Sequence, residues 1–254
     1  MTAQASSTRR AADFITARPI AHRGLHDMSK GVVENTSSAF GAAIAKGYAI
    51  ECDLQLTADG EAVVFHDEHL ERLTEGHGMV KDLTAAEMKR QVIRHSHDHV
   101  QTLGELLQQV KGQVPLVIEL KSHWDGDERL AARALEVLAG YDGPYCLMSF
   151  DPDAIAAVRR MSPSTLRGIV AERGFDSYYD ALPLPKQAAL RTFSHIERTR
   201  PDFVSFYFEE LPWAPISALR ASGLPVITWT IRSPAEAWRA RRCSDQITFE
   251  GFLA

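Results

Sequence analysis

Residues Tyr48-Ala49-Ile50-Glu51-Cys52-Asp53-Leu54 form a largely apolar run that carries two acidic side chains one residue apart. In a β-strand, alternate side chains lie on the same face, so Glu51 and Asp53 would point one way and Cys52 the other. Two carboxylates on one inward face repel each other and are costly to desolvate unless a cation lies between them. An exposed edge strand with ordinary charges is the alternative, but the apolar neighbours argue against full exposure. The stretch therefore predicts a buried strand that presents acids to a cation.

Strand-like and helix-like segments alternate on either side of this stretch. Apolar runs typical of strands are centred on Pro19, Ile50, Val117, Leu147, Ile169, Val204, Ile227 and Ile247. The helices expected between them are Ser37–Lys46, Leu103–Lys111, Glu128–Leu138, Pro152–Met161, Pro185–Leu190, Ala214–Ser222 and Ala235–Arg242. Such alternation implies parallel strands joined by crossover helices, and eight units predict a closed (β/α)8 TIM barrel. A doubly wound open sheet is the alternative, but no GxGxxG motif follows the first strand.

One part of the chain departs from this alternation. Ala62–Phe65 is expected to pair with the acidic strand as an extra hairpin arm, because a turn at Asp59-Gly60 separates the two. The residues from about 68 to 102 are polar and irregular apart from a short helical piece, Ala85–Gln91, and we expect them to form a small insertion after the second strand. Residues 1–17 form a polar lead-in. The whole chain, 1–254, is thus predicted to be a single barrel domain.

The composition argues against several classes of protein. The chain has 254 residues, of which 45% are hydrophobic and 24% charged, and its net charge of −5 does not suit a broad nucleic-acid surface. Its three scattered cysteines are expected to be buried thiols rather than disulfides. The amino-terminal residues resemble neither a secretion signal nor a membrane anchor, and no run approaches the ~18 apolar residues of a spanning helix. We therefore expect a cytoplasmic protein without stable membrane insertion, and leave its oligomeric state open.

Unusual polar residues fall where the predicted strands and the hairpin arm end. They are His22, Arg23, Glu51, Asp53, His66, Glu119, Lys121 and Trp229. In a TIM barrel the carboxyl ends of the strands meet at one rim, which is where such barrels carry their chemistry. These residues are therefore expected to gather in one site.

The acids and histidines of this set have distinct chemical uses. Glu51, Asp53 and Glu119 supply hard oxygen ligands, which suit Mg²⁺ or Ca²⁺ rather than zinc. His22 and His66 are candidates for general acid and general base, because imidazole titrates near neutral pH.

Two cations complete the expected site. Arg23 and Lys121 would hold an anionic group such as phosphate, although Lys121 could instead merely pair with Glu119 or Glu51. A divalent ion, two histidines and two cations together predict phosphodiester cleavage. The ion would offset charge on the phosphoryl oxygens while one histidine deprotonates the nucleophile and the other protonates the leaving oxygen.

Taken together, the motifs of the first half of the chain resemble those of the glycerophosphodiester phosphodiesterase family. They are His22-Arg23-Gly24, Glu34-Asn35-Thr36, Glu51-x-Asp53, Thr57-x-Asp59-Gly60, Val64-x-His66-Asp67, Arg72 and Ile118-Glu119-x-Lys121. They follow the order of the family, and their combination is specific although each alone is weak. The second half resembles the family more loosely, through Ser149-Phe150-Asp151-Pro152 and Thr228-Trp229-Thr230.

This resemblance implies a small, cytoplasmic, bacterial-type member of the family: a TIM barrel with an insertion after the second strand. It implies the same metal-ligand, acid/base and phosphate-binding roles for the residues named above. It also implies that a hydroxyl of the substrate's glycerol attacks phosphorus and gives a cyclic phosphate that water then opens. The products would be glycerol 3-phosphate and a free alcohol.

The chain departs from the family pattern at two strand ends. Where the family usually has Asn shortly after the Trp-Thr pair, this chain has Ile231-Arg232. Where the family often ends its last strand in Thr-Asp, this chain has Thr248-Phe249-Glu250. We expect these departures to affect the choice of substrate more than the reaction.

Several residues have two interpretations. Glu34 and Asn35 either contact the substrate or only order their loop, where Asn35 or Thr36 could cap the helix that follows. Trp229 is either a barrel-core aromatic or a wall of the glycerol or alcohol pocket. The run His95-x-His97-x-His99 could bind zinc if it were a strand, but its polar neighbours favour a solvated loop.

Other functions remain possible from the sequence. A lysophospholipase D would need an apolar groove at the rim, which Phe206, Tyr207, Phe208, Leu211 and Trp213 could supply unless they only pack a loop. A non-catalytic binding barrel would be expected to lack part of the acid/base or ligand set, and no gap is seen. A nucleic-acid phosphodiesterase is disfavoured by the acidic balance.

Overall fold

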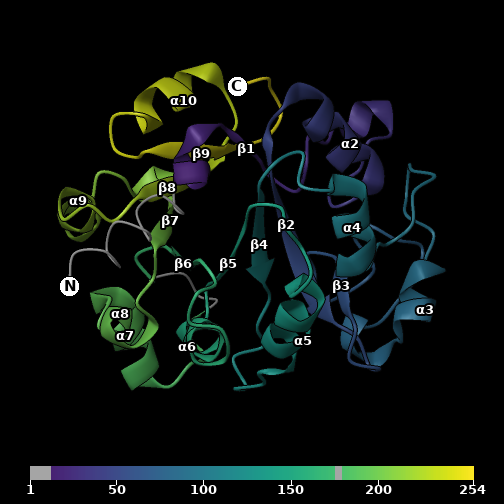
Figure 1. Cartoon of the computed structure of the whole chain (residues 1–254), viewed down its shortest axis with the longest axis horizontal. Helices are drawn as coiled ribbons and strands as arrows, with labels where there is room; N and C mark the ends of the chain where they lie inside the picture. The colour runs from purple at the N-terminus through teal and green to yellow at the C-terminus, as the bar shows by residue number, and fades with distance from the viewer. Residues whose placement is uncertain (1–12, 175–178) are drawn as a thin grey trace.

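The computed structural model describes residues 13–174 and 179–254, and in them eight parallel strands form a closed ring (Figure 1). The strands are β1 (Ile20–Ala21), β2 (Ala49–Leu56), β4 (Leu116–Leu120), β5 (Tyr145–Ser149), β6 (Arg167–Ala171), β7 (Phe203–Tyr207), β8 (Val226–Ile231) and β9 (Gln246–Phe249). Because β1 pairs with β2 on one side and with β9 on the other, no edge of the ring is left open. This confirms the predicted (β/α)8 TIM barrel.

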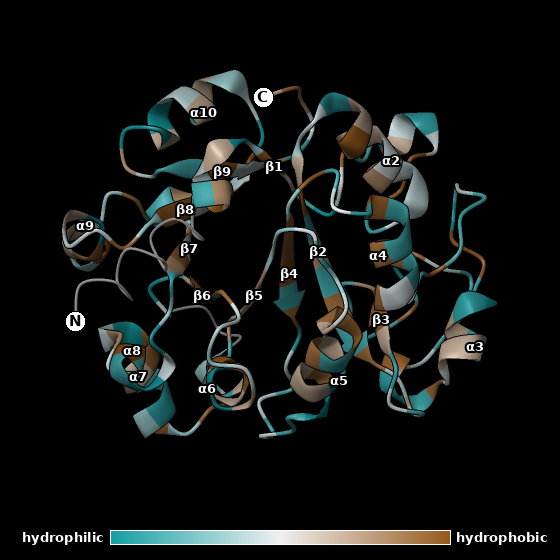
Figure 2. Ribbon diagram, viewed as in Figure 1, coloured by the Kyte–Doolittle hydropathy of each residue, from teal (hydrophilic) through white to brown (hydrophobic). Residues whose placement is uncertain are grey.

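Helices surround the ring, and in Figure 2 they show both teal and brown stretches, as expected when one face of a helix packs on strands and the other meets water. They are α2 (Ser37–Lys46), α3 (Ala85–Lys89), α4 (Leu103–Val110), α5 (Arg129–Leu138), α6 (Pro152–Met161), α7 (Leu184–Thr192), α8 (Ile196–Thr199), α9 (Ala214–Ala221) and α10 (Pro234–Ala240). Capping residues in the sequence fix the first residue of several of these helices. Helix α4, for example, starts with a capping box in which the Thr102 side chain accepts from Glu105 N and the Glu105 side chain accepts from Thr102 N. None of the helices in the described residues is long and apolar enough to cross a membrane.

A layer of apolar side chains fills the inside of the ring, on the amino-terminal side of the polar residues at the rim. Its buried members include Ile20, Ala49, Val117, Cys146, Met148, Val170, Phe203 and Ile227. Gly168 on β6 makes room for a large neighbour, since a Cβ there would lie only 2.3 Å from the Phe203 ring. Cys52, on the opposite face of β2, packs in the core between strands and helices, as the alternation predicted. The rim residues therefore stand on a tightly filled base.

The hairpin arm and the insertion lie beside the ring. Strand β3 (Ala62–Val64) pairs antiparallel with the end of β2, where Leu54 lies opposite Val64. The insertion, which contains α3, has a small hydrophobic core of its own. The members of that core are Val33, Val63, Phe65, Leu70, Leu73, Val80, Met88, Ile93 and Val100. The hairpin thus carries His66 from a separately packed unit to the rim.

Some boundaries differ from those expected. Strand β1 has only two residues, because the chain turns immediately after Ala21, and β2 runs on to Leu56, so its acids lie within the strand rather than at its end. A short helix, α8, was not expected. Of the lead-in, residues 1–12 lie outside the described residues, and 13–17 are helical. Thr36 is the N-cap residue of α2 but makes no side-chain capping bond. The Asn35 side chain does not cap the helix either, and bonds to Asp53 instead.

The cysteines form no disulfide, and the histidine run of the insertion forms no strand. All three cysteines are free, with Cys52 and Cys146 buried and Cys243 half-buried. The histidines at 95, 97 and 99 lie in an irregular part of the insertion rather than on a strand, which confirms the loop interpretation.

Candidate active site

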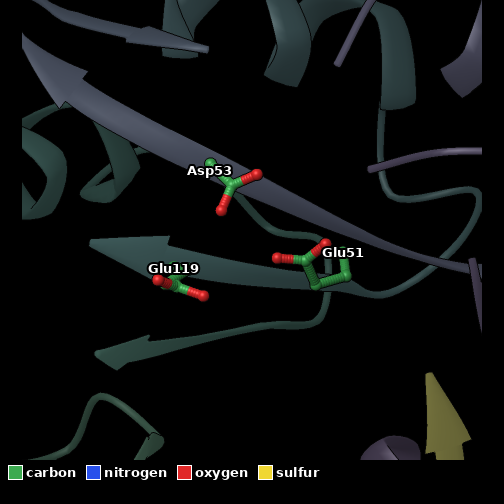
Figure 3. Close-up of side chains that lie close together, drawn as sticks. All are labelled: Glu51, Asp53 and Glu119. Atoms are coloured by element: carbon green, nitrogen blue, oxygen red, sulfur yellow. The ribbon is translucent and has the colours of Figure 1, made fainter. Parts of the chain in front are cut away.

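Three acids converge on the inward face of two neighbouring strands. Asp53 on β2 and Glu119 on β4 are direct partners in the parallel register, and Glu51 precedes Asp53 by two residues on the same face. Figure 3 shows the three carboxylates turned toward a common space. One ligand oxygen from each lies within 4.8 Å of the others, and the residues are only 2%, 1% and 6% exposed. The sequence prediction that these acids meet is confirmed.

The acids differ in how their charge is balanced. Burial, the Asp53 charge and the Glu119 charge raise the pKa of Glu51 well above its usual value. Burial likewise raises the pKa of Glu119, and Asp53 adds to that effect although Lys121 opposes it. Burial alone would raise the pKa of Asp53 too, but Lys121, His66 and Arg23 lower it strongly. Two of the three carboxylates therefore lack sufficient positive charge around them.

This donor set fits a hard divalent cation. Three carboxylates supply oxygen ligands at close quarters, and among the described residues the ligand group itself contains neither the cysteine sulfurs nor the imidazole nitrogens that zinc prefers. Burial, followed by the charges of Asp53 and Glu119, raises the pKa of Glu51, and a divalent ion would favour its ionised form against these effects. The residues that would hold it are Glu51, Asp53 and Glu119.

Lys121 points into the acid cluster. Its Nζ lies 2.8 Å from Asp53 Oδ1 and 2.6 Å from Glu119 Oε1. Burial lowers the pKa of this lysine, but the two carboxylates more than offset burial and raise it. The ammonium group therefore stays charged at the centre of the site. It pairs with two of the acids, and its position would also let it bind an anionic substrate.

Arg23 is fixed by acids on both sides. Its Nη1 donates to Glu34 Oε1 at 2.6 Å and its Nε lies 3.5 Å from Asp53 Oδ2. Glu34 also accepts two hydrogen bonds from Arg72. Although burial raises the pKa of Glu34, Arg72 and Arg23 lower it to about 2. Glu34 therefore links the two arginines and does not itself line the cavities described below.

Asn35 orients an acid of the cluster. Its Nδ2 donates to Asp53 Oδ2 at 2.8 Å, and its Oδ1 accepts from Asp53 N at 3.3 Å. Its backbone lies in the left-handed region, with φ of 56°, which asparagine tolerates better than most residues. The structure thus places Asn35 behind Asp53, where the sequence allowed either substrate contact or a loop role.

The two histidines each have a carboxylate at Nδ1. His22 Nδ1 lies 2.5 Å from Glu250 Oε2, and its Nε2 lies 4.0 Å from Glu51 Oε2. Burial lowers the pKa of His22, and Glu250 only partly opposes this. His66 Nδ1 lies 2.7 Å from Asp67 Oδ1, and Arg72 holds Asp67 through two hydrogen bonds. In both rings the remaining nitrogen, Nε2, is left for chemistry.

Two cavities open at this rim. The smaller, about 240 Å³, contains His22, Arg23, the three acids, His66 and Lys121, together with Trp229. The larger cavity, of about 770 Å³, shares His66, Glu119 and Lys121 with the smaller one. Residues at the start of the insertion form another part of its wall. The residues predicted for metal binding, acid/base catalysis and substrate or phosphate binding therefore line the smaller cavity, except Glu34 and Asn35, and Trp229 forms part of its wall.

The sequence interpretation missed some residues of this site. Phe150 lines both cavities and packs edge-on against Trp229, with ring centroids 5.5 Å apart. The family-like Ser149-Phe150-Asp151-Pro152 motif was its only signal. Glu250, which contacts His22, was passed over because it departs from the family pattern, and Arg232 likewise lines the smaller cavity.

The chain matches the model of the glycerophosphoryl diester phosphodiesterase family over residues 22–246. A glycerophosphodiester phosphodiesterase of Caldanaerobacter subterraneus subsp. tengcongensis is 31% identical over 223 residues, which cover 84% of each chain. Among solved structures, an Oleispira antarctica phosphodiesterase in complex with the product sn-glycerol-3-phosphate is similar, with a TM-score of 0.77, 24% identity, and 93% of this chain and 94% of that chain covered. A glycerophosphodiester phosphodiesterase of Thermotoga maritima has a TM-score of 0.69 at 24% identity, with 91% and 92% covered.

Proposed function

This chain belongs to the glycerophosphoryl diester phosphodiesterase family, and we propose that it hydrolyses glycerophosphodiesters to glycerol 3-phosphate and an alcohol in the cytoplasm, with Mg²⁺ or Ca²⁺ as cofactor. The observation that best supports this is the buried cluster of Glu51, Asp53 and Glu119 with His22 and His66 at the same cavity. A bound cation would offset negative charge on the phosphoryl oxygens. The remaining chemistry falls to side chains of the protein.

The cavities favour different roles for the two histidines. His22 lines only the smaller cavity, whereas His66 lies where the two cavities meet. We assign His22 Nε2 as the base that takes the proton of a glycerol hydroxyl, whose oxygen then bonds to phosphorus. The bond from phosphorus to the departing oxygen breaks, and His66 donates a proton to that oxygen. Reversal of these roles, with water as nucleophile, would open the cyclic phosphate.

Arg23 and Lys121 would hold the phosphate during both steps. Both side chains line the smaller cavity and both remain charged, because the neighbouring acids raise their pKa values against the effect of burial. Glu34 and Asn35 would act from behind, by fixing Arg23 and Asp53. This arrangement would orient the phosphoryl group and stabilise the charge that develops on it.

The departing alcohol would lie in the larger cavity. Phe150 bounds both spaces, and Trp229 closes the smaller one, whose volume of about 240 Å³ suits a glycerol unit. Two of the aromatic residues that could have formed an acyl-binding groove pack on each other instead: Phe206 is fully buried and stacks on Trp213, with ring centroids 5.6 Å apart. This favours a deacylated diester over a lysophospholipid.

The test is release of glycerol 3-phosphate from a panel of glycerophosphodiesters, measured with and without EDTA. We expect chelation, His22→Ala and Glu51→Gln each to remove most turnover, and Mg²⁺ or Ca²⁺ to restore it in the unchanged protein. His77→Ala, at an exposed histidine of the insertion, serves as the matched control. Full turnover in EDTA, or in His22→Ala, would contradict the proposal. Lysophosphatidylcholine should be a poor substrate beside glycerophosphocholine.

A further inference from the structure

The carboxylate of Glu250 is surrounded by three nitrogen-bearing side chains. Its Oε2 lies 2.5 Å from His22 Nδ1 and 3.6 Å from His26 Nε2, and its Oε1 accepts from Arg232 Nε at 2.8 Å. We propose that Glu250, anchored by Arg232, is the positioning residue that fixes the ring and the tautomer of His22. The inference deepens the proposed function, since it rests on His22 as the base.

The contact selects one form of the imidazole. An ionised carboxylate can only accept hydrogen bonds, so His22 Nδ1 must carry the proton that lies between it and Glu250. In neutral imidazole the other nitrogen, Nε2, then holds the lone pair. That nitrogen faces the acid cluster, 4.0 Å from Glu51 Oε2, inside the smaller cavity. The selected tautomer is thus the one able to take a proton from a substrate hydroxyl.

Three neighbouring strands supply this arrangement. His22 follows β1 and its backbone N donates to Phe249 O of β9, while Glu250 N donates to Ile231 O of β8. The backbone of Arg232 is held in turn by Glu236, whose side chain accepts from Arg232 N at 2.6 Å. Each partner is therefore fixed by barrel pairing or by the start of α10, which limits rotation of the carboxylate.

The Arg232–Glu250 pair also accounts for both departures from the family pattern. Arg232 stands near the usual Asn and Glu250 one residue beyond the usual Thr-Asp, and these two residues bind each other. Arg232 is 62% exposed, so its ion pair is expected to add little to stability. Glu250 is 17% exposed and bonds the ring directly. The value of the pair therefore lies in orientation rather than in folding free energy.

The first readout is the tautomer of His22 in the metal-free protein, measured by long-range ¹H–¹⁵N NMR. The unchanged protein should show protonated Nδ1. Glu250→Ala should lose that preference, and Glu250→Gln should keep much of it, because the amide oxygen still accepts a hydrogen bond. Glu209→Gln, which removes an exposed acid near the end of β7, is the matched control and should change nothing. Thermal unfolding of each variant checks that it is folded.

The second readout separates kcat from KM in the metal-loaded enzyme. Glu250→Ala should lower kcat roughly 100-fold with little change in KM, since a misplaced base affects the chemical step. Arg232→Leu should give a smaller fall of the same kind. An unchanged His22 tautomer in Glu250→Ala, or an unchanged kcat, would overturn the inference. If His22→Ala itself keeps full turnover, the proposed function fails instead, and the NMR result still decides whether Glu250 positions the ring.

Discussion

Lys121 Nζ lies 2.8 Å from Asp53 Oδ1, inside the group of carboxylates that would hold a divalent cation. The lysine and the cation would therefore share the same negative charge. In a buried site, two positive charges so close together oppose each other's binding, while both favour a phosphate between them.

Lys121→Met should separate metal binding from catalysis. Removal of the ammonium group leaves the acid cluster more negative, so Mg²⁺ or Ca²⁺ should bind roughly ten-fold or more tightly in isothermal titration calorimetry. Turnover should nevertheless fall, because the phosphate loses a cation. Lys81→Met, an exposed site in the insertion, is the control for loss of a lysine. Weaker metal binding in Lys121→Met would contradict this account of the site.

Glu51→Gln should stabilise the metal-free protein while it abolishes metal binding. Because burial and the neighbouring acids raise the pKa of Glu51, its carboxylate form is unfavourable in the fold at neutral pH. A neutral amide removes that repulsion, and its oxygen can still accept from Arg23 N, as the carboxylate does at 2.9 Å. We expect Tm in EDTA to rise by about 2–4 °C, and the rise on addition of Mg²⁺ to disappear. A lower Tm in EDTA would count against carboxylate repulsion at this site.

Trp213→Ala should reduce stability without changing substrate choice. Trp213 stacks on Phe206 at an interplanar angle of 26°, and the Arg173 guanidinium lies over the Trp213 ring, 5.7 Å from its centroid. Truncation should cost about 2–3 kcal/mol in urea unfolding. The ratio of turnover between glycerophosphocholine and lysophosphatidylcholine should stay the same. If Trp213→Ala lowered turnover of lysophosphatidylcholine alone, the result would instead support an apolar groove that binds the acyl chain.

His195 should make the protein less stable in mild acid. The side chain is 4% exposed and its Nδ1 makes no hydrogen bond within the described part of the chain. Burial, together with Arg198, lowers the pKa of His195 from 6.5 to about 4. Between pH 6.5 and pH 4, His195 therefore binds a proton in the unfolded chain but not in the folded protein. The free energy of unfolding keeps its full value above pH 6.5 and falls as the pH drops toward 4.

The measurement is urea unfolding of the unchanged protein and of His195→Leu across that pH range. The stability of the unchanged protein relative to the variant should fall by up to about 3 kcal/mol between pH 6.5 and pH 4. His77→Leu, at a histidine that is exposed, should follow the unchanged protein. Parallel curves for His195→Leu and the unchanged protein would show that His195 titrates normally.

The acid cluster could be predicted because its geometry is local to strands. Glu51 and Asp53 share a face through the two-residue repeat, and a parallel register then brings Glu119 beside Asp53. The barrel itself followed from the alternation of strands with helices. These features depend on periodicity and spacing, both of which a single sequence displays.

Other parts of the site depend on contacts that no local pattern encodes. His22 and Glu250 are 228 residues apart and meet only because the ring closes. Asn35 had an equally good local use as a helix cap, and its bond to Asp53 depends on the path of the loop between β1 and α2. The first strand was expected to be centred on Pro19, but β1 comprises only Ile20–Ala21, because the chain turns directly after Ala21.

The closure of the ring through the two-residue strand β1 has a consequence for denaturation. So short a segment offers few ladder bonds, and partial opening of the molecule should begin at this seam, where His22 stands on one side and Glu250 on the other. Low concentrations of urea should therefore inactivate the enzyme before its circular dichroism changes. Loss of turnover would then report the local opening of the ring at β1 at urea concentrations well below those that unfold the whole protein.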